Sequence, residues 1–167
     1  MVYNRLVRRL RETGIGTFPD YLSELQRAGS TEWQPFINAL TTNLTAFFRE
    51  EYHFPVLAEF LKRVARPGRT VGIWCAAAST GQEPYSIAMT ALEALGPKPA
   101  VRVFASDIDT EVLAEAREGV YAADAVAKLD AQRLRRFFFR GVGDNQGWVR
   151  VRPEVSALIR FAQVNLI

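Results

Sequence analysis

Small and acidic residues follow two apolar runs in an order typical of nucleoside-binding sites. The segment from Trp74 to Pro84, WCAAASTGQEP, is rich in alanine, serine and glycine, so its backbone amides could approach a ligand closely. The second run, VRVFASDI, carries Asp107 near its end and is followed by Asp109. A carboxylate at that place in a βαβ unit can accept hydrogen bonds from both ribose hydroxyls of a nucleoside. The two segments together indicate an adenosine-containing ligand.

Each of these acidic residues also has a structural explanation. Asp109 precedes the helical segment TEVLAEARE and favours a helix cap, whereas Asp107 at a buried strand end needs a partner of some kind. Glu83 lies beside Pro84 in the first turn of an expected helix, where it could complement the helix dipole or face a cationic ligand group. The loop has no GxGxxG sequence, so spacing alone leaves the ligand open.

The chain offers little for metal binding or nucleophilic catalysis. Its one cysteine, Cys75, lies in the apolar run VGIWCAAA, where we expect a core residue with no disulfide or zinc partner. Its one histidine, His53, precedes Pro55 at a helix start, and we expect a structural or surface role for it. We therefore expect no metal site.

Composition predicts a globular protein of the cytoplasm. The 167 residues are 49% hydrophobic and 23% charged, with no apolar run near the roughly 20 residues of a membrane helix and no apolar signal segment at the start. The net charge of +3 is small, but four arginines crowd one short segment: Arg5, Arg8, Arg9 and Arg11. They form either a solvated helix face or a docking face for an acidic partner. Without interleaved aromatic residues they give little support to nucleic-acid binding.

Residues 1–66 are expected to form a small all-helical domain that ends in a linker helix. Apolar residues recur at helical spacing in the first segment, Thr17 can cap a second helix, and Ser30 or Thr31 can cap a third. The segment TTNLTAFFRE favours a turn, Pro55 is expected to start the linker helix, and Pro67-Gly68 ends it.

From residue 67 the spacing of the apolar residues changes, and continuous apolar runs alternate with helical segments as in an α/β fold. The runs TVGIWCAA and VRVFASDI predict parallel strands covered on both faces, with a helix from Pro84 to Leu95 between them. Asp109 and Asp130 are expected to cap the next two helices. The later segments FFFRGVG, GWVRVRPEV and LIRFAQV alternate apolar with polar residues, which indicates an inserted antiparallel subdomain over about residues 136–164. Residues 67–167 thus read as a Rossmann-like domain with that insertion.

A parallel sheet of only two or three strands would have an open edge and an uncovered face. We therefore expect the Rossmann-like domain to be incomplete within these 167 residues, and the chain by itself to be inactive as an enzyme.

Three segments, LTTNLTAFFRE, CAAASTGQEPYSIA and VFASDIDTEVLAEAR, resemble the chemotaxis receptor glutamate methyltransferases, the CheR family. The resemblance covers essentially the whole chain, and the segments are long and share their order and spacing with the family. It implies a helical domain followed by a Rossmann-like S-adenosylmethionine domain with a small antiparallel subdomain. It also implies a methyl transfer from S-adenosyl-L-methionine to glutamate side chains during adaptation, a part of signal transduction in bacterial chemotaxis.

The resemblance assigns site residues. Arg49 would be both catalytic and cofactor-binding, and Asp107 rather than Asp109 would be the ribose-binding acid. The implied cofactor contacts are Asn43, Thr45, Arg49, Glu83, Asp107, Asn165 and Leu166.

The implied partners are methyl-accepting chemotaxis receptors, with no nucleic acid and no membrane insertion. Arg5 and Arg11 would face the acidic methylation helices. The antiparallel subdomain would bind the receptor's carboxyl-terminal tail peptide by strand addition, through Arg140, Gly141, Gly143, Gly147, Trp148 and Arg150. The glycines could equally be hairpin turn residues.

Two alternatives stay open. A nicotinamide-dependent oxidoreductase could use the same βαβ arrangement. The chain could also be a non-catalytic receptor-binding fragment, because nothing in it corresponds to the family's CRN-type segment and the aromatic residue that follows it.

Overall fold

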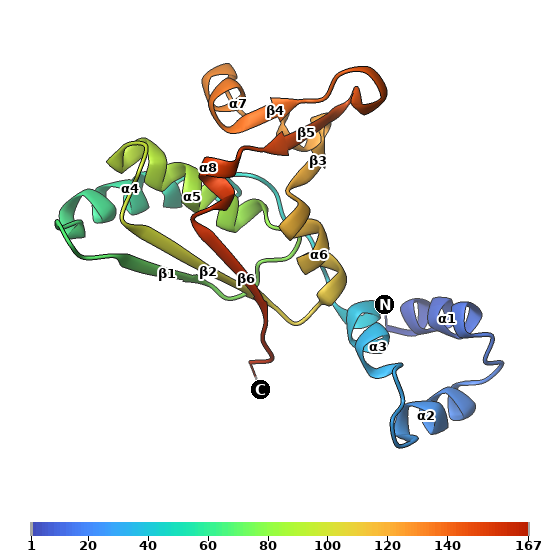
Figure 1. Cartoon of the computed structure of the whole chain (residues 1–167). Helices are drawn as coiled ribbons and strands as arrows, with labels where there is room; N and C mark the ends of the chain where they lie inside the picture. The colour runs from blue at the N-terminus through green and yellow to red at the C-terminus, as the bar shows by residue number, and fades with distance from the viewer. Residues whose placement is uncertain (1, 167) are drawn as a thin grey trace.

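The computed structural model describes residues 2–166, and its first part is a group of three short helices (Figure 1). These are α1 (Val2–Thr13), α2 (Phe18–Gln26) and α3 (Trp33–Leu40), which pack around Leu10, Tyr21 and Leu25. Thr17 caps α2 as predicted, because its hydroxyl accepts a hydrogen bond from the amide of Asp20 at 3.2 Å.

The predicted caps of α3 are wrong. Glu32 occupies the N-cap position instead of Ser30 or Thr31, and its side chain makes no capping hydrogen bond. The Glu32 carboxylate is drawn toward α1 and α2, where it accepts hydrogen bonds from Arg9 at 2.7 Å and from the Tyr21 hydroxyl at 2.7 Å. A partly buried ion pair thus takes the place of a local cap.

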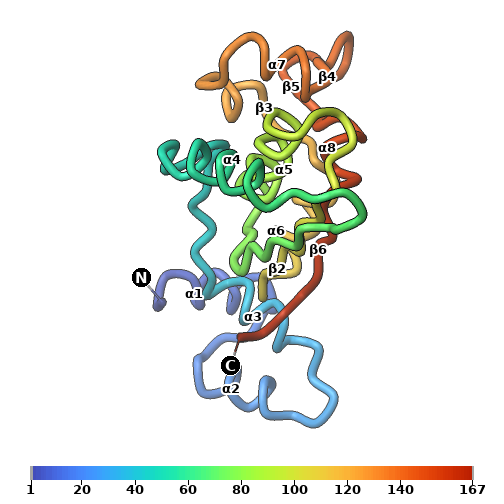
Figure 2. The backbone as a smooth tube through the Cα atoms, turned by 90° about the vertical axis from the view of Figure 1, so that its left-hand side faces the viewer, coloured from blue at the N-terminus to red at the C-terminus, as the bar shows by residue number. Residues whose placement is uncertain are grey.

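Helix α4 (His53–Val64) begins two residues before Pro55, so the proline stands in its first turn rather than at its start. Phe54 and Leu61 of this helix are buried against the next helix, α5 (Gln82–Leu95). Figure 2 shows the extended linker rising from α3 past the middle of the molecule to α4. The linker therefore joins the helical part to the sheet.

Three strands form a parallel sheet in the order β1-β2-β6: β1 (Val71–Cys75), β2 (Val101–Asp107) and β6 (Ile159–Gln163). The prediction that LIRFAQV belongs to the antiparallel sheet is wrong, because β6 pairs in parallel with β2, from Val103 opposite Ile159 to Asp107 opposite Gln163. Alternation of polar and apolar residues indicates a strand with one exposed face. It does not indicate whether the strand pairs in parallel or antiparallel.

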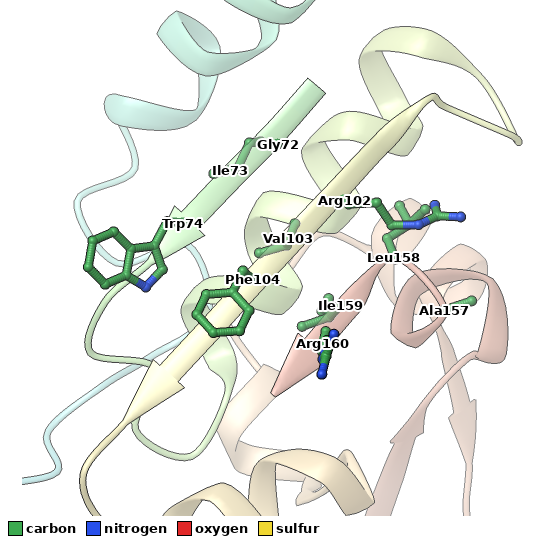
Figure 3. A pocket seen from close by; sticks show the side chains of 10 residues that line it. All are labelled: Gly72, Ile73, Trp74, Arg102, Val103, Phe104, Ala157, Leu158, Ile159 and Arg160. Carbon is green, nitrogen blue, oxygen red and sulfur yellow. The ribbon is translucent and has the colours of Figure 1, made fainter. Parts of the chain in front are cut away.

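The described residues cover only one face of this sheet. Val101, Val103 and Ala105 of β2 point into a core with α4 and α5, whereas Phe104 is 37% exposed on the other face. Figure 3 shows Trp74, Phe104 and Arg160 along that open face, which Trp74 of β1 shares at 57% exposure. The apolar runs predicted strands covered on both faces, and that prediction is wrong for the described residues. The separate prediction that a sheet of so few strands has an uncovered face is confirmed for them.

The antiparallel sheet has the order β3-β5-β4, with β3 (Val120–Ala122), β5 (Trp148–Val151) and β4 (Phe138–Arg140). It starts earlier than residue 136, because β3 directly follows α6 (Thr110–Glu118), and it ends before β6. The 3₁₀ turn η1 (Ala123–Val126) and helix α7 (Ala131–Phe137) connect β3 to β4. The turn η2 (Gly143–Asn145) lies between β4 and β5, and α8 (Pro153–Ser156) returns the chain to the parallel sheet.

Asp109 and Asp130 cap α6 and α7 as predicted, each accepting two backbone hydrogen bonds. A second core joins the two sheets through α5, with Tyr85, Tyr121, Phe137, Phe138 and Val155 among its members. In residues 2–166 no helix has the length and apolar character needed to span a bilayer.

Candidate functional site

Asp107 stands at the carboxyl end of the middle strand and organises the loop that follows β1. One carboxylate oxygen accepts a hydrogen bond from the amide of Ser79 at 2.8 Å, and the other accepts one from the amide of Asp109 at 3.0 Å. The side chain is 9% exposed. Each oxygen has a second lone pair, so the carboxylate can still accept from a ligand while it holds both amides.

Ser79 is the unusual residue of this loop. Its backbone has φ +48°, which is uncommon for a residue with a side chain, and its hydroxyl is buried with no hydrogen-bond partner within the described residues. An unpaired buried hydroxyl costs free energy, so an orphan of this kind in the loop between β1 and α5 points to a ligand group.

Gly81 ends the loop at the N-cap of α5, with φ +97°. A Cβ atom added there would lie 2.9 Å from the Tyr121 hydroxyl oxygen and 2.9 Å from the Ala116 Cβ. Glycine is thus required at this position both for its backbone angle and for the close approach of α6 and β3.

Glu83 lies in the first turn of α5, where it complements the helix dipole as one of its two predicted roles requires. Its carboxylate is exposed and accepts a hydrogen bond from the Cys75 thiol at a sulfur–oxygen distance of 3.2 Å. Cys75 is buried, as predicted, and burial together with the hydrogen bond to Glu83 raises the pKa of its thiol. The protonated thiol therefore serves as a donor that orients Glu83 and is no nucleophile.

Asp109 does more than cap α6. While one oxygen accepts from the amide of Glu111 at 2.9 Å, the other accepts from the side-chain amide of Asn43 at 2.8 Å and from the hydroxyl of Thr41. Asn43, a predicted cofactor contact, is thus bound to a residue that we expected to act locally. The capping signal was visible in the sequence, but nothing in the sequence indicated this link to the linker.

Arg49 lies in a tight turn of the linker and is exposed. Its guanidinium donates to the carbonyl of Leu44 at 2.9 Å, and its neighbours Phe48 and Glu50 have φ of +52° and +53°. Two positive φ angles on residues with side chains indicate a turn held by its surroundings. Thr45, four residues earlier, is half-buried.

Several contacts hold the Arg49 turn. Phe47 is buried with its ring 5.0 Å from that of Tyr121, and the amide of Phe48 donates to the Ser86 hydroxyl at 2.9 Å. The guanidinium of Arg133 lies 4.0 Å from the centre of the Phe48 ring and makes a bidentate ion pair with Glu93. Sequence reasoning missed Ser86, Glu93 and Arg133, because each acts across a large separation.

Asn165 and Leu166 follow β6 at the same edge of the sheet. The amide of the preceding residue, Val164, donates to the carbonyl of Asp107 at 3.0 Å, which ties this segment to the end of β2, and Leu166 is exposed. The fold therefore gathers Glu83, Asp107, Asn165 and, through Asp109, Asn43 near the carboxyl ends of the parallel strands, the usual ligand edge of α/β sheets.

The two arginines predicted to face a receptor differ in their surroundings. Arg5 donates to the carbonyls of Leu40 and Thr41 and to the hydroxyl of Thr42, so its guanidinium holds the end of α3. Arg11 is exposed in the last turn of α1. Arg5 is thus engaged within the chain, and only Arg11 of this pair is presented to solvent.

The candidate peptide-binding residues lie on the antiparallel subdomain. Arg140, Gly141, Trp148 and Arg150 line a small cavity of about 260 Å³. At Gly141 an added Cβ would overlap the carbonyl oxygen of Asn145 at 1.9 Å.

The other two glycines of this set lie in the turn between β4 and β5. Gly143 and Gly147 have φ of +58° and +88°, so the turn requires both glycines for conformational reasons, whatever they bind. The single histidine, His53, is exposed at the start of α4. Within residues 2–166 no cluster of histidine, cysteine or acidic residues is placed to hold a metal ion.

Comparison with known proteins agrees with this geometry. Residues 1–41 match the family described as CheR methyltransferase, all-alpha domain, and residues 43–167 match CheR methyltransferase, SAM binding domain. Similar proteins include the chemotaxis protein methyltransferases of Salmonella typhimurium, 57% identical, and of Escherichia coli, 54% identical, and chemotaxis protein methyltransferase 2 of Pseudomonas aeruginosa, 52% identical.

Each match covers 100% of this chain, but the chain spans only 58% of the length of the first two relatives and 60% of the third. The helical first part and the parallel sheet of this chain fit the two matched domains. The chain therefore belongs to the CheR methyltransferase family.

Proposed function

We propose that the protein that carries this chain is an S-adenosylmethionine-dependent protein-glutamate O-methyltransferase that acts on methyl-accepting chemotaxis receptors in the cytoplasm. The observation that carries the proposal is the loop of residues 76–82, in which Asp107 holds the amide of Ser79 while the buried Ser79 hydroxyl has no partner within residues 2–166. A reducing compartment is consistent with the free thiol of Cys75.

The residues of the loop fit S-adenosylmethionine. Asp107 has lone pairs left for ribose hydroxyls, the Ser79 hydroxyl needs a partner, and the exposed carboxylate of Glu83 suits a positively charged group. The cofactor would supply an activated methyl group on a sulfonium.

The chain's own task would be alignment and removal of water. A glutamate side chain is ionised at neutral pH, so no general base is needed to make it a nucleophile. Correct placement of two reactants can supply roughly 7–11 kcal/mol of the barrier. Arg49, which is exposed in the turn of the linker, would contact the cofactor and would attract and orient the acidic substrate.

The receptor would be held at two further surfaces. Arg11 is placed to attract the acidic methylation helices of a receptor. The edge strand β4 pairs with β5 on one side, so a tail peptide could add beside it, near Arg140 and Trp148.

Calorimetry with the 167-residue chain tests the cofactor assignment. We expect S-adenosylhomocysteine to bind and NADH not to bind. Binding of NADH with no binding of S-adenosylhomocysteine would overturn the proposal in favour of an oxidoreductase. Binding of a receptor tail peptide to the same chain, measured in the same way, tests the substrate part separately.

A further inference from the structure

Tyr121 belongs to the antiparallel sheet, yet its hydroxyl reaches the loop at the end of the parallel sheet. It lies in β3, where its backbone pairs with Val149 of β5. The hydroxyl donates to the carbonyl oxygen of Thr80 at 2.7 Å, and the side chain is buried. The antiparallel subdomain thus contacts the loop of residues 76–82 through a specific hydrogen bond.

The hydrogen bond from Tyr121 to Thr80 lies between the two residues of the loop that have positive φ angles. Thr80 stands between Ser79 and Gly81, whose φ angles are +48° and +97°. The amide of Ser79 donates to Asp107 on one side of Thr80, and the space beside Gly81 on the other side is closed by the Tyr121 hydroxyl. Positive φ angles persist where surrounding contacts impose them, and here the contacts are Asp107 and Tyr121.

The ring of Tyr121 meets the linker as well. It lies edge-on to Phe47 with 5.0 Å between ring centres, and Phe47 also packs edge-on against Phe138 of β4 at 5.4 Å. Phe47 lies within the turn that carries Arg49. One side chain therefore contacts both segments that we assign to cofactor and substrate binding, by a hydrogen bond to the first and by ring packing to the second.

We propose that Tyr121 is a positioning residue of the cofactor site, whose hydroxyl fixes the loop of residues 79–81 against Asp107. It acts through Thr80 and is not itself a ligand, so it is not a catalytic residue. The proposal rests on the proposed function for its cofactor readout, but the claim about loop position can be tested without a cofactor.

The chain offers a matched control in Tyr85. Its hydroxyl is also buried and also donates to a backbone carbonyl, that of Ala116, at 2.7 Å. The two rings lie 6.2 Å apart in the same core, but the Tyr85 hydroxyl is bound to α6 rather than to the loop. Tyr121→Phe and Tyr85→Phe therefore remove equivalent hydrogen bonds, and only the first should release Thr80.

Two measurements on the 167-residue chain and both variants decide the matter. In hydrogen exchange we expect the amide of Ser79 to exchange faster in Tyr121→Phe than in Tyr85→Phe, when each is compared at equal distance from its own unfolding midpoint. By calorimetry we expect Tyr121→Phe to weaken S-adenosylhomocysteine binding by roughly three- to tenfold, the equivalent of one hydrogen bond, and Tyr85→Phe to leave it unchanged.

Equal exchange at Ser79 in the two variants would overturn the positioning role, and so would equal affinity. Absence of S-adenosylhomocysteine binding in the unmodified chain would count against the proposed function instead, and the exchange comparison would still decide whether Tyr121 holds the loop. Tyr121→Leu, which removes the ring that packs on Phe47 as well, should add a loss of protection at the neighbouring amide of Phe48, which donates to Ser86, that Tyr121→Phe does not show.

Discussion

The side-chain amide of Asn43 donates to the carboxylate of Asp109 at 2.8 Å, across 66 residues of sequence. Asp109 uses its other oxygen to cap α6, so the helix start and the linker share one buried anion. The linker that leads to Arg49 is thereby attached to the carboxyl end of the parallel sheet. Asp109, which its sequence position predicts to be a local helix cap, thus also connects the linker to the parallel sheet.

Asp107→Asn should weaken binding of S-adenosylhomocysteine by about 1–3 kcal/mol, because it removes the charged acceptor that we propose for the ribose. Asp109→Asn is the control. The Asp109 carboxylate caps α6 and accepts a hydrogen bond from Asn43, so we expect its replacement to lower the stability of the chain more than its affinity for the ligand. Calorimetry and thermal unfolding of both variants give the comparison. Unchanged affinity in a folded Asp107→Asn chain would show that Asp107 holds only the loop.

Arg5→Ala should lower the free energy of unfolding by about 1–3 kcal/mol, because the guanidinium binds the end of α3 through charge-assisted hydrogen bonds. Arg11→Ala, an exposed change on the same helix, should stay within about 0.5 kcal/mol of the unmodified chain. Urea unfolding measures both. Equal stability of the two variants would show that the Arg5 contacts contribute nothing.

The Arg11→Ala variant also tests whether Arg11 belongs to the receptor-binding surface. Arg11→Ala should weaken binding to glutamate-rich receptor helices at low salt, and added salt should reduce the difference because screening removes the same attraction. A variant that binds as well as the unmodified chain at low salt would exclude Arg11 from the receptor surface.

Gly81→Ala should destabilise the chain and weaken S-adenosylhomocysteine binding, because the new methyl group would meet Tyr121 and Ala116 at a positive φ. Gly29→Ala separates the two causes, since Gly29 also has a positive φ, +79°, but no atom within 4 Å of the added Cβ. We expect about 1 kcal/mol for the backbone angle alone and more for Gly81→Ala. Similar losses at the two positions would mean that the packing around Gly81 adapts.

Tyr21 should make the helical domain sensitive to alkali. Burial, followed by the hydrogen bond to Glu32, raises the pKa of its hydroxyl from 10.0 to about 12. The raised pKa means that the folded state favours the protonated form, so this stabilisation is complete below pH 10 and is lost as the pH rises toward 12. Between pH 10 and pH 12 the free energy of unfolding of Tyr21→Phe should therefore fall less than that of the unmodified chain. Urea unfolding at a series of pH values measures both. Parallel curves would contradict the assignment.

The sequence predicted those features that depend on neighbouring residues. Thr17, Asp109 and Asp130 are helix caps because a cap needs only a short side chain beside its own helix, and Cys75 is buried because it lies in an apolar strand. The family and its fold also followed from long local segments.

Features that depend on distant residues escaped prediction. The direction of β6 is set by pairing with β2 rather than by its own alternation, and α3 lacks its expected cap because Glu32 is bound to Arg9 and Tyr21. The contacts of Asp109 with the linker and of Tyr121 with Thr80 are of the same kind. Local patterns cannot report them, because the partner is chosen by the three-dimensional fold.

The strand order β1-β2-β6 has a consequence for the rate at which this chain folds. β6 must pair with β2 after the intervening residues 108–158. It also contacts the helical part, where the side-chain amide of Gln163 donates to the side-chain oxygen of Gln34 at 2.6 Å across 129 residues. Pairings over such separations close large loops and are slow to form, whereas the helices and the β3-β5-β4 sheet depend on shorter ones. We expect the docking of β6 to be the late, rate-limiting step, so that the ligand edge of the sheet is completed only after the antiparallel subdomain has already folded.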